Sequence, residues 1–498
     1  MTENLYGQFR AQFSSRMTQP FLIGRRGIMT YGALDALSAR IAGALLSFGA
    51  KPGDRIAAQI EKSPQGVALY LGALRAGLVF LPLNPAYRDD EIAYFLHDAE
   101  PRIVVSDPGF AAIQRLAADL QNCSTLTLDA NGGGTLLEVA GKEADTGAIH
   151  ASAAKELAAI LYSSGTTGKP KGVMLTHGNL ASNARTLHRL WQFAPDDVLV
   201  HALPIFHVHG LFVALNTSLL NGTPILFHER FDPGAVIADL PRATVFMGVP
   251  TFYVRLLASS ALSKSTCAHM RLFISGSAPL LPDTFERFAE RTGHRILERY
   301  GMTEAGMITS ALPDRPRRAG AVGWPLPDVS LRLAPESSEI EIKGPNVFAG
   351  YWRKPDKTAE DFTADGYFKT GDIGAIDGDG VVSIVGRAKD LFISGGLNVY
   401  PKEIEACIDA LPGVDESAVV GMPHDDFGEA GLAVVVMKPG ASPLELDITV
   451  AALKTQLAGY KVPKAIVTAE SLPRNAMGKV QKAELRKTYA ALWASRSR

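Results

Sequence analysis

Residues 157–172 read Leu-Ala-Ala-Ile-Leu-Tyr-Ser-Ser-Gly-Thr-Thr-Gly-Lys-Pro-Lys-Gly, an apolar run that leads directly into a loop of small, hydroxylated and basic residues. The apolar run is short enough to be a buried strand. Glycines allow a close backbone approach, so successive N–H groups of the loop can converge on one anion. Hydroxyls and lysines add further donors and positive charge. The stretch predicts a polyphosphate site formed by Ser163, Ser164, Gly165, Thr166, Thr167, Gly168, Lys169 and Lys171.

A plain surface turn is the alternative interpretation of this loop. The common nucleotide motif G-x-x-x-x-G-K-[ST] is excluded, because Pro170 stands five residues after Gly165 and no Gly-Lys-Ser/Thr follows. If the loop binds ATP, it therefore does so in another geometry.

The composition is that of a soluble globular protein with more than one domain. The chain has 498 residues, 47% of them hydrophobic and 20% charged, which is too long for a single core. Its net charge of −1 provides no global field for nucleic acid or an anionic membrane. Neither a membrane-spanning stretch nor a secretory signal is evident. Three widely spaced cysteines argue against disulfides or a structural zinc site, so we expect a cytoplasmic protein without nucleic-acid or membrane partners.

Strand and helix patterns alternate along most of the chain. Residues 31–48 and 177–190 have helical periodicity, and residues 53–60 and 78–83 read as strands. Such alternation predicts an α/β fold with doubly wound sheets.

The pattern changes from about residue 320, where short strands and dense turns predict a β-rich subdomain. A further α+β pattern begins near residue 402 and is the size of a small domain. We therefore expect a large N-terminal domain over residues 1–386, a hinge at 387–390 and a small mobile domain over 391–498.

Four more segments follow the phosphate loop in order. They are residues 299–304 (Arg-Tyr-Gly-Met-Thr-Glu), 370–372 (Thr-Gly-Asp), 386–396 (Gly-Arg-Ala-Lys-Asp-Leu-Phe-Ile-Ser-Gly-Gly) and 473–479 (Pro-Arg-Asn-Ala-Met-Gly-Lys). Each alone is weak, since an Asp after Thr-Gly is usually a turn residue and a lone lysine usually lies on the surface. Together with the loop, they make the chain resemble the adenylate-forming superfamily of acyl-CoA synthetases, luciferases and peptide-synthetase adenylation domains over essentially its whole length.

The reaction that this resemblance implies explains the residue types. A carboxylate attacks the α-phosphate of ATP to give an acyl-adenylate and pyrophosphate, and the thiol of CoA then displaces AMP. Both partners in the first step are anions, so catalysis depends mainly on charge neutralisation and positioning. The implied cofactors and co-substrates are ATP, Mg²⁺ and CoA.

The resemblance also assigns roles within the large domain. The loop would hold the β- and γ-phosphates, Glu304 would ligate Mg²⁺ with Thr166, and Thr303 would hydrogen-bond the α-phosphate. Asp372 would accept hydrogen bonds from the ribose hydroxyls, with Arg387 beside it. The adenine slot would be formed by Ser277, Ala278, Pro279, Glu298, Arg299, Tyr300, Gly301 and Met302.

In the small domain, the resemblance implies that Lys479 bridges the α-phosphate and the acyl carboxylate. After a rotation near Lys389, the opposite face, with Gly395 and Gly396, would line a channel for the CoA thiol. The sequence around Lys479 also resembles the context in which such synthetases are silenced by acetylation. A lysine acetylase acting on Lys479 is therefore an expected partner.

Two segments bear on the acid that is activated. Residues 205–210 (Ile-Phe-His-Val-His-Gly) lie where the superfamily lines the acyl pocket. Peptide-synthetase domains place an Asp there for an ammonium group, and Phe206-His207 in its place disfavours an amino acid. His207 matches the gating position of the family, whereas His209 has no such match. Ser275 is also expected to contact the substrate.

An arginine that faces the acyl pocket would pair bidentately with a second carboxylate, and Arg255 follows Gly-Val-Pro-Thr-Phe-Tyr-Val. The alternative is that this side chain snorkels to the surface. This segment, with His-Val-His-Gly-Leu-Phe and Leu-Glu-Arg-Tyr-Gly-Met-Thr-Glu, resembles malonyl-CoA synthetases, which take malonate and often methylmalonate. We therefore predict malonate–CoA ligation, with Arg255 on the distal carboxylate and Arg299 as its rival.

Two other functions stay open at this point. One is a CoA ligase for another short or branched carboxylic acid. The other, from a different class, is a protein that binds ATP or an acyl-adenylate, or loads a carrier, without turning over CoA. Intact Lys479, Gly395 and Gly396 argue against the latter.

Overall fold

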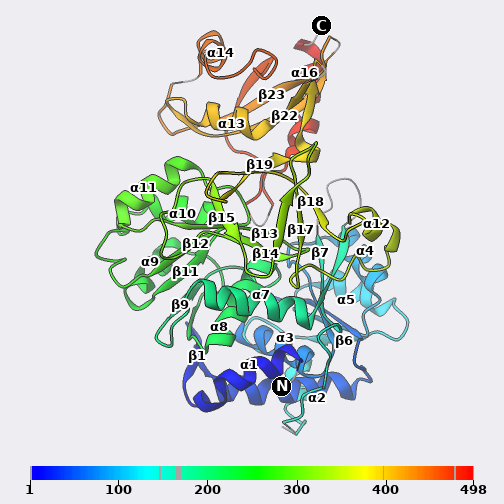
Figure 1. The fold of residues 1–498 in the computed structure, drawn as a ribbon. Coiled ribbons are helices and arrows are strands. Elements are labelled where there is room, and N and C mark those ends of the chain that lie inside the picture. Colours follow the sequence, from blue (N-terminus) through cyan, green and yellow to red (C-terminus); the bar gives the residue numbers. More distant parts are fainter. Residues whose placement is uncertain are drawn as a thin grey trace. The chain divides into compact units, whose positions relative to one another are not determined.

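The computed structural model describes residues 3–144, 147–163, 170–395, 397–424, 426–442, 444–475 and 478–496. They form two compact units (Figure 1): unit 1 is Met1–Ser330 with Lys343–Phe368, and unit 2 is Leu331–Ile342 with Lys369–Arg498. The predicted hinge at 387–390 lies inside unit 2 and stays a prediction. In the part of the chain that is described, no helix is both long and apolar enough to cross a membrane.

The first sheet of unit 1 carries the phosphate loop at its edge. Its strand order is β6-β5-β3-β4-β7-β8, parallel throughout except for the last, antiparallel pair. The strands are β3 (Arg55–Gln59), β4 (Val79–Pro82), β5 (Ile103–Ser106), β6 (Ser124–Thr127), β7 (Leu157–Ser163) and β8 (Lys171–Thr176). The sequence predicted the strands that are β3, β4 and β7, but not β6 or β8. Because β7 and β8 are antiparallel neighbours, the loop joins the two strands of a hairpin.

The second sheet of unit 1 carries the other candidate site residues. Its order is β15-β14-β13-β12-β11-β9-β10-β1-β2. Strands β1 (Pro20–Gly24), β10 (Ile225–Phe227), β9 (Leu199–His201), β11 (Val245–Gly248), β12 (Leu272–Ser275) and β13 (Leu297–Met302) run parallel, whereas β2 (Gly27–Thr30), β14 (Gly306–Ser310) and β15 (Ala321–Pro325) are antiparallel. The parallel strands β9–β12 are mostly buried apolar runs, as strands covered on both faces require.

Helices pack against these sheets and confirm the predicted α/β class. The predicted helices at 31–48 and 177–190 are α2 (Tyr31–Ser47) and α7 (His177–Leu190), and α3 (Pro64–Arg75) and α4 (Asp89–Ala99) lie between strands of the first sheet. On the second sheet, α9 (Pro233–Asp239), α10 (Pro250–Leu257) and α11 (Pro282–Thr292) bury an aromatic cluster. Helix α7 follows β8 directly, because the Thr176 side chain caps its first turn and Asn179 caps back.

Unit 2 contains two sheets. One has the order β16-β17-β18-β19: β16 (Ser330–Leu333), β17 (Glu339–Lys343), β18 (Phe368–Ile376) and β19 (Val382–Arg387). The other has the order β21-β20-β23-β22, with β24 beside β23: β20 (Phe392–Ser394), β21 (Leu397–Val399), β22 (Val414–His424), β23 (Gly428–Met437) and β24 (Ala465–Ala469). Helices α13 (Pro401–Asp409), α14 (Leu446–Lys454) and α15 (Lys482–Thr488) complete the small α+β part.

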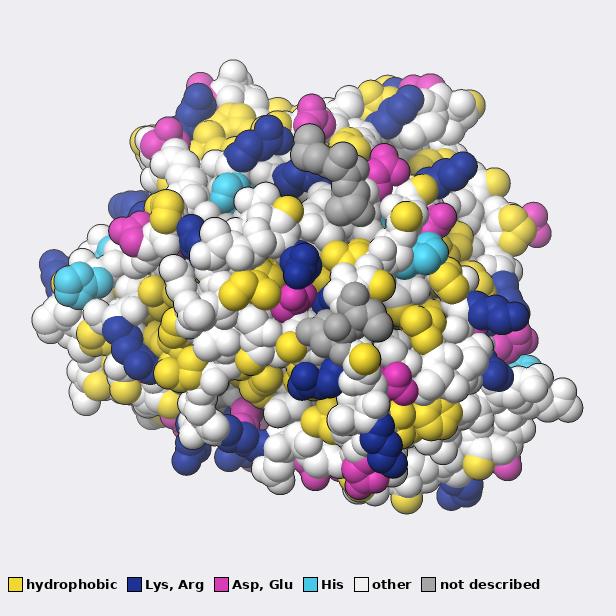
Figure 2. Space-filling view, turned by 90° about the horizontal axis from the view of Figure 1, so that it is seen from below, with side chains coloured by type: hydrophobic (Ala, Val, Ile, Leu, Met, Phe, Trp, Pro, Cys, Tyr) yellow, Lys and Arg dark blue, Asp and Glu magenta, His cyan; other side chains and the backbone are white. Residues whose placement is uncertain are grey.

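The surface agrees with the near-neutral net charge. On the face shown in Figure 2, Lys and Arg side chains are interspersed with Asp and Glu and with hydrophobic side chains. Charges mixed in this way generate little long-range field.

Candidate active site

The phosphate loop connects two antiparallel strands, β7 and β8. Strand β7 ends at Ser163 and β8 begins at Lys171, and these two residues lie opposite each other in the antiparallel pair. Lys171 forms an ion pair with Asp361 at 3.7 Å, and its Nζ lies 4.5 Å from the centre of the Tyr351 ring. Most of the loop between Ser163 and Lys171 lies outside the described residues, namely Ser164, Gly165, Thr166, Thr167, Gly168 and Lys169. The phosphate and metal contacts of these residues therefore stay predictions.

The turn between β13 and β14 brings Glu304 to this hairpin. The Ser163 hydroxyl donates to Glu304 Oε1 at 3.2 Å, and the Tyr351 hydroxyl lies 3.5 Å from the same oxygen. Burial, followed by the charges of Glu304 and Asp361, raises the pKa of Tyr351, so it stays a neutral donor. Two motifs 141 residues apart in the chain therefore meet as one buried polar site.

The predicted adenine slot lies at the ends of β12 and β13. Strand β12 ends at Ser275, and Ser277 follows in a left-handed conformation with φ of +73°. Glu298 is buried and accepts a hydrogen bond from the Gly320 N–H at 2.8 Å. Of the remaining slot residues, Tyr300, Gly301 and Met302 end β13, and Ala278 and Pro279 follow Ser277 in the segment after β12. Their contacts with adenine stay a prediction.

Arg299 is a buried cation on β13. It is 4% exposed, and its Nε and Nη2 atoms have no hydrogen-bond partner among the described residues. The guanidinium packs over Gly276, where an added Cβ would lie 2.4 Å from it. Burial lowers the pKa of Arg299 to about 9, so the group remains charged at neutral pH. A buried charge without a counter-charge is costly, and a second carboxylate on the substrate would supply one.

Two more unpartnered polar atoms lie in buried side chains near these strands. Ser275 Oγ and His209 Nε2 are buried without a partner in the described part of the chain. His209 Nδ1 lies 3.3 Å from Ser277 Oγ, and burial, followed by the charge of Arg299, lowers the pKa of His209 well below its usual range. His209 is therefore a neutral imidazole. Nothing in the sequence pointed to it beyond its place two residues after His207.

His207 is half-buried and begins the turn that leads to His209. The His209 N–H donates to His207 Nδ1 at 3.3 Å. This contact fixes the His207 ring relative to the chain segment that the family resemblance assigns to the acyl pocket. Its gating role stays a prediction.

Arg255 lies on the outer face of α10. Its side chain is exposed, as is that of Val254, whereas Tyr253 and Leu256 are buried. On a helix with 3.6 residues per turn, positions 253 and 256 share one face, and position 255 points away from that face. Arg255 is therefore not the buried arginine, which is its rival, Arg299. The contact of Arg255 with the distal carboxylate stays a prediction, because an exposed side chain can line a substrate site that is open to solvent.

The pairing expected beside the ribose site is present in unit 2. Asp372 on β18 lies opposite Arg387 on β19, and Arg387 Nε lies 2.9 Å from Asp372 Oδ1. Asp372 is buried, so the ion pair holds the carboxylate in one orientation. Its contact with ribose stays a prediction.

Lys479 of unit 2 is hydrogen-bonded to Asn475. The Lys479 N–H donates to Asn475 Oδ1, and its carbonyl accepts from the Asn475 N–H, both at 3.0 Å. Arg474 bonds both the Gly478 carbonyl and Glu416. Burial and nearby cations, chiefly Arg387, lower the pKa of Lys479 to about 8.

The predicted hinge residue is perturbed in a similar way. Burial and the charge of Arg387 lower the pKa of Lys389 to about 8. Gly395 has φ of +59°, in the left-handed region that glycine tolerates best. Gly396 lies outside the described residues, so the thiol channel stays a prediction.

Comparison with known proteins supplies the context for this geometry. The model of the family described as "AMP-binding enzyme" matches residues 9–352, and that of the "AMP-binding enzyme C-terminal domain" matches residues 403–479. Among solved structures, ATP-bound MatB from Rhodopseudomonas palustris is 50% identical and superposes with a TM-score of 0.96, over 99% of this chain and 100% of that one.

Curated relatives include enzymes for different acids. A malonate–CoA ligase from Arabidopsis thaliana is 35% identical over 89% of this chain and 79% of its own length. A feruloyl-CoA synthase from Amycolatopsis is also 35% identical, over 93% of this chain and 94% of its own length. Overall identity to these two relatives thus does not separate an aliphatic diacid from an aromatic acid.

Proposed function

The chain belongs to the AMP-binding enzymes, and on that premise we propose that it ligates malonate to CoA through an acyl-adenylate, with AMP and pyrophosphate as the other products. Methylmalonate is the expected second substrate. ATP and CoA are the co-substrates, and Mg²⁺ is the proposed cofactor.

The observation that carries the choice of acid is Arg299. Its guanidinium is charged, buried and lacks a hydrogen-bond partner for two of its nitrogens among the described residues. A monocarboxylate would place its only anion at the α-phosphate and leave this cation uncompensated. A diacid provides one carboxylate for each site. Planar bidentate pairing with a guanidinium also favours a carboxylate over a hydroxyl.

In the adenylation step, one malonate oxygen attacks the α-phosphorus and the bond to the bridging oxygen of pyrophosphate breaks. The loop that starts at Ser163 would hold the departing phosphates through backbone N–H groups and hydroxyls. Thr303 would donate to an α-phosphate oxygen. Lys479 would neutralise the charge where the two anions approach.

In the thiolysis step, the CoA thiolate attacks the acyl carbon and AMP leaves with the bonding electron pair. Arg299 would keep the distal carboxylate fixed during both steps, so the acyl carbon stays in one place. His207 would close the acyl pocket against water until the thiol arrives. Asp372 would retain AMP through its ribose hydroxyls until thiolysis is complete.

The residues present fit Mg²⁺. Glu304 offers a hard carboxylate, largely buried, beside Ser163 at the edge of the phosphate loop. Mg²⁺ is usually held by one or two carboxylates together with substrate phosphates. When bound, the ion would neutralise charge on the phosphate oxygens.

The second candidate is a CoA ligase for another acid, and the similarity to a feruloyl-CoA synthase is the observation that favours it. A panel of malonate, methylmalonate, succinate, acetate, benzoate and ferulate distinguishes the two by pyrophosphate release. We expect malonate to give the highest kcat/KM, followed by methylmalonate. Higher values for ferulate, benzoate or acetate would contradict the malonate assignment.

Glu304→Gln is expected to lower malonate-dependent pyrophosphate release about 10²-fold. The substitution keeps the shape and the hydrogen bond from Ser163 but removes the negative charge that would ligate Mg²⁺. Calorimetry should then show that Mg²⁺ no longer strengthens ATP binding. An unchanged effect of Mg²⁺ on ATP affinity would remove Glu304 from the metal site. Asp197→Asn, which changes a buried carboxylate that pairs with Arg271 and has no predicted contact with ATP or Mg²⁺, is the matched comparison.

A further inference from the structure

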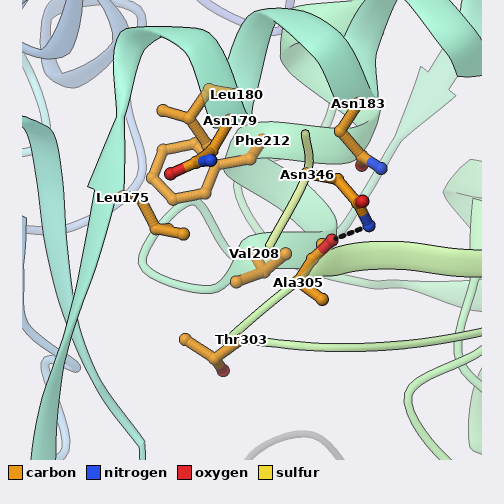
Figure 3. Close-up of a pocket in the computed structure, with 10 residues that line it drawn as sticks. Leu175, Asn179, Leu180, Asn183, Val208, Phe212, Thr303, Ala305 and Asn346 are labelled. Carbon is orange, nitrogen blue, oxygen red and sulfur yellow. Dashed lines mark hydrogen bonds between the residues drawn. The ribbon is translucent and has the colours of Figure 1, made fainter. Parts of the chain in front are cut away.

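Two asparagines from distant parts of unit 1 hold the turn that carries Thr303 and Glu304. Asn183 lies on α7, and Asn346 lies in the segment that follows β17. Figure 3 shows Asn346 beside Ala305, with the hydrogen bond between them drawn, and Asn183 above Asn346. Both are at least nine-tenths buried. No motif in the sequence singled out either residue.

Asn183 pairs with the peptide of Met307 as a neighbouring strand would. Its Nδ2 donates to the Met307 carbonyl at 2.9 Å, and its Oδ1 accepts from the Met307 N–H at 3.1 Å. Gly306 allows this approach, because its φ is +58° and a Cβ there would lie 2.7 Å from Asn183 Oδ1. Only a primary amide supplies a donor and an acceptor in this arrangement.

Asn346 donates to two carbonyls of the same turn. Its Nδ2 donates to the carbonyls of Ala305 at 2.9 Å and Met307 at 3.1 Å. Two residues further on, the Phe348 N–H donates to the Glu304 carbonyl at 2.8 Å. The backbone from the Glu304 carbonyl to Met307 is therefore fixed by bonds from outside the turn.

The space around these bonds leaves little room for rearrangement. A cavity of only about 10 Å³ separates the turn from α7. Its apolar lining comes from Leu175, Leu180, Val208 and Phe212, and its polar lining includes Asn179, Asn183, Thr303 and Asn346 (Figure 3). A turn that lost its bonds to Asn183 would be left with unpaired backbone groups in a buried site, which favours a shifted position.

We propose that Asn183 and Asn346 are positioning residues for the reaction, which set the place of Glu304 and Thr303 relative to the phosphate loop. The proposal rests on the proposed function, because it assigns these bonds to metal and phosphate geometry. Helix α7 begins immediately after β8, so Asn183 ties the strand that follows the phosphate loop to the turn that carries Glu304. A displacement of about 1 Å at a reacting centre can lower a rate by about 10²-fold.

Asn183→Asp tests the proposal, since it is isosteric and keeps the acceptor for the Met307 N–H. It replaces the donor to the Met307 carbonyl by a negatively charged oxygen. We expect kcat for pyrophosphate release to fall about 10- to 100-fold and the half-saturating Mg²⁺ concentration to rise several-fold. The KM for malonate should stay unchanged. Calorimetry should show a smaller gain in ATP affinity on adding Mg²⁺.

Asn221→Asp is the matched control. Asn221 also lies on a helix of unit 1 and donates from Nδ2 to a backbone carbonyl, that of Ala194, at 2.7 Å. It should match Asn183→Asp in loss of melting temperature but retain the wild-type Mg²⁺ dependence. If Asn183→Asp does not fold, Asn346→Ala, which removes two bonds without adding a charge, is measured in the same way.

The outcomes separate this inference from the proposed function. If the wild-type protein releases no pyrophosphate with malonate, the proposed function fails. If the wild type is active and Asn183→Asp shows the Mg²⁺ dependence and kcat of Asn221→Asp, the positioning role is wrong. Where Asn346→Ala replaces Asn183→Asp, the same match to Asn221→Asp would equally contradict the positioning role.

Discussion

Lys479→Ala is expected to lower malonate-dependent pyrophosphate release about 10²- to 10³-fold, while the reaction of supplied malonyl-adenylate with CoA stays within about threefold of wild type. The first step brings two anions together and needs the ammonium, whereas the second step needs the acyl-adenylate and the thiol. Separate assays of pyrophosphate release and of acyl-CoA formation from the synthetic adenylate measure the two steps. Equal losses in both would contradict the assignment of Lys479 to adenylation alone.

The pH profile provides a control for this prediction. Burial and the charges of Arg387 and Lys389 lower the pKa of Lys479 to about 8, although Asp372 and Asp390 act in the opposite direction. The ammonium is present below that pH and lost above it, so adenylation should fall as the pH rises through about 8. Lys479→Arg keeps its charge at these pH values. The adenylation rate of Lys479→Arg should therefore not fall as the pH rises through about 8, even if its maximal rate is lower.

Arg299→Ala is expected to lower kcat/KM for malonate by about 10²-fold or more, because removing one partner of a buried charge pair costs about 2–5 kcal/mol. Propionate, which has no distal carboxylate, should gain relative to malonate. The KM for ATP should stay close to that of the wild type, which separates an acyl-pocket role from the adenine-slot role. Steady-state kinetics with both acids over a range of ATP concentrations measure all three quantities.

Two further variants sharpen this test. Arg255→Ala changes an exposed arginine, and it should leave malonate use within about threefold of wild type. Gly276→Ala would place a Cβ 2.4 Å from the Arg299 guanidinium, so it should displace the cation and lower malonate use without removing the charge. If Arg255→Ala lost most of its kcat/KM for malonate while Arg299→Ala behaved as the wild type, Arg255 and not Arg299 would bind the distal carboxylate.

Much of the fold could be predicted because its signals are local. The periodicity of residues 31–48 and 177–190 identified α2 and α7 to within one residue at each end. Strand β8 was missed, since Lys171–Thr176 follows a Gly- and Pro-rich loop that looks like irregular chain. Its pairing with β7 is antiparallel, and a local pattern does not specify the partner of a strand.

The residues of the candidate site also fall into two groups, those that the sequence pointed to and those that it did not. Glu304 and Asp372 were recognisable because each belongs to a short motif in a fixed order along the chain. Asn183 and Asn346 belong to no motif, and their role depends on bonds to a turn that lies 39 residues away or further along the chain.

The sequence by itself therefore indicated the class of enzyme, because five short motifs in a fixed order resemble one family, and the family models confirm that the chain belongs to it. Only the tertiary structure decided which arginine is buried. Arg255 follows a pattern similar to that of malonate enzymes, yet Tyr253 and Leu256 take the inner face of α10 and turn Arg255 outward. Arg299 lies on β13 between neighbouring strands, and packing there removes its guanidinium from water. Burial depends on the neighbours that the fold brings together. A buried cation loses its hydration, and a carboxylate that pairs with it offsets that cost in free energy.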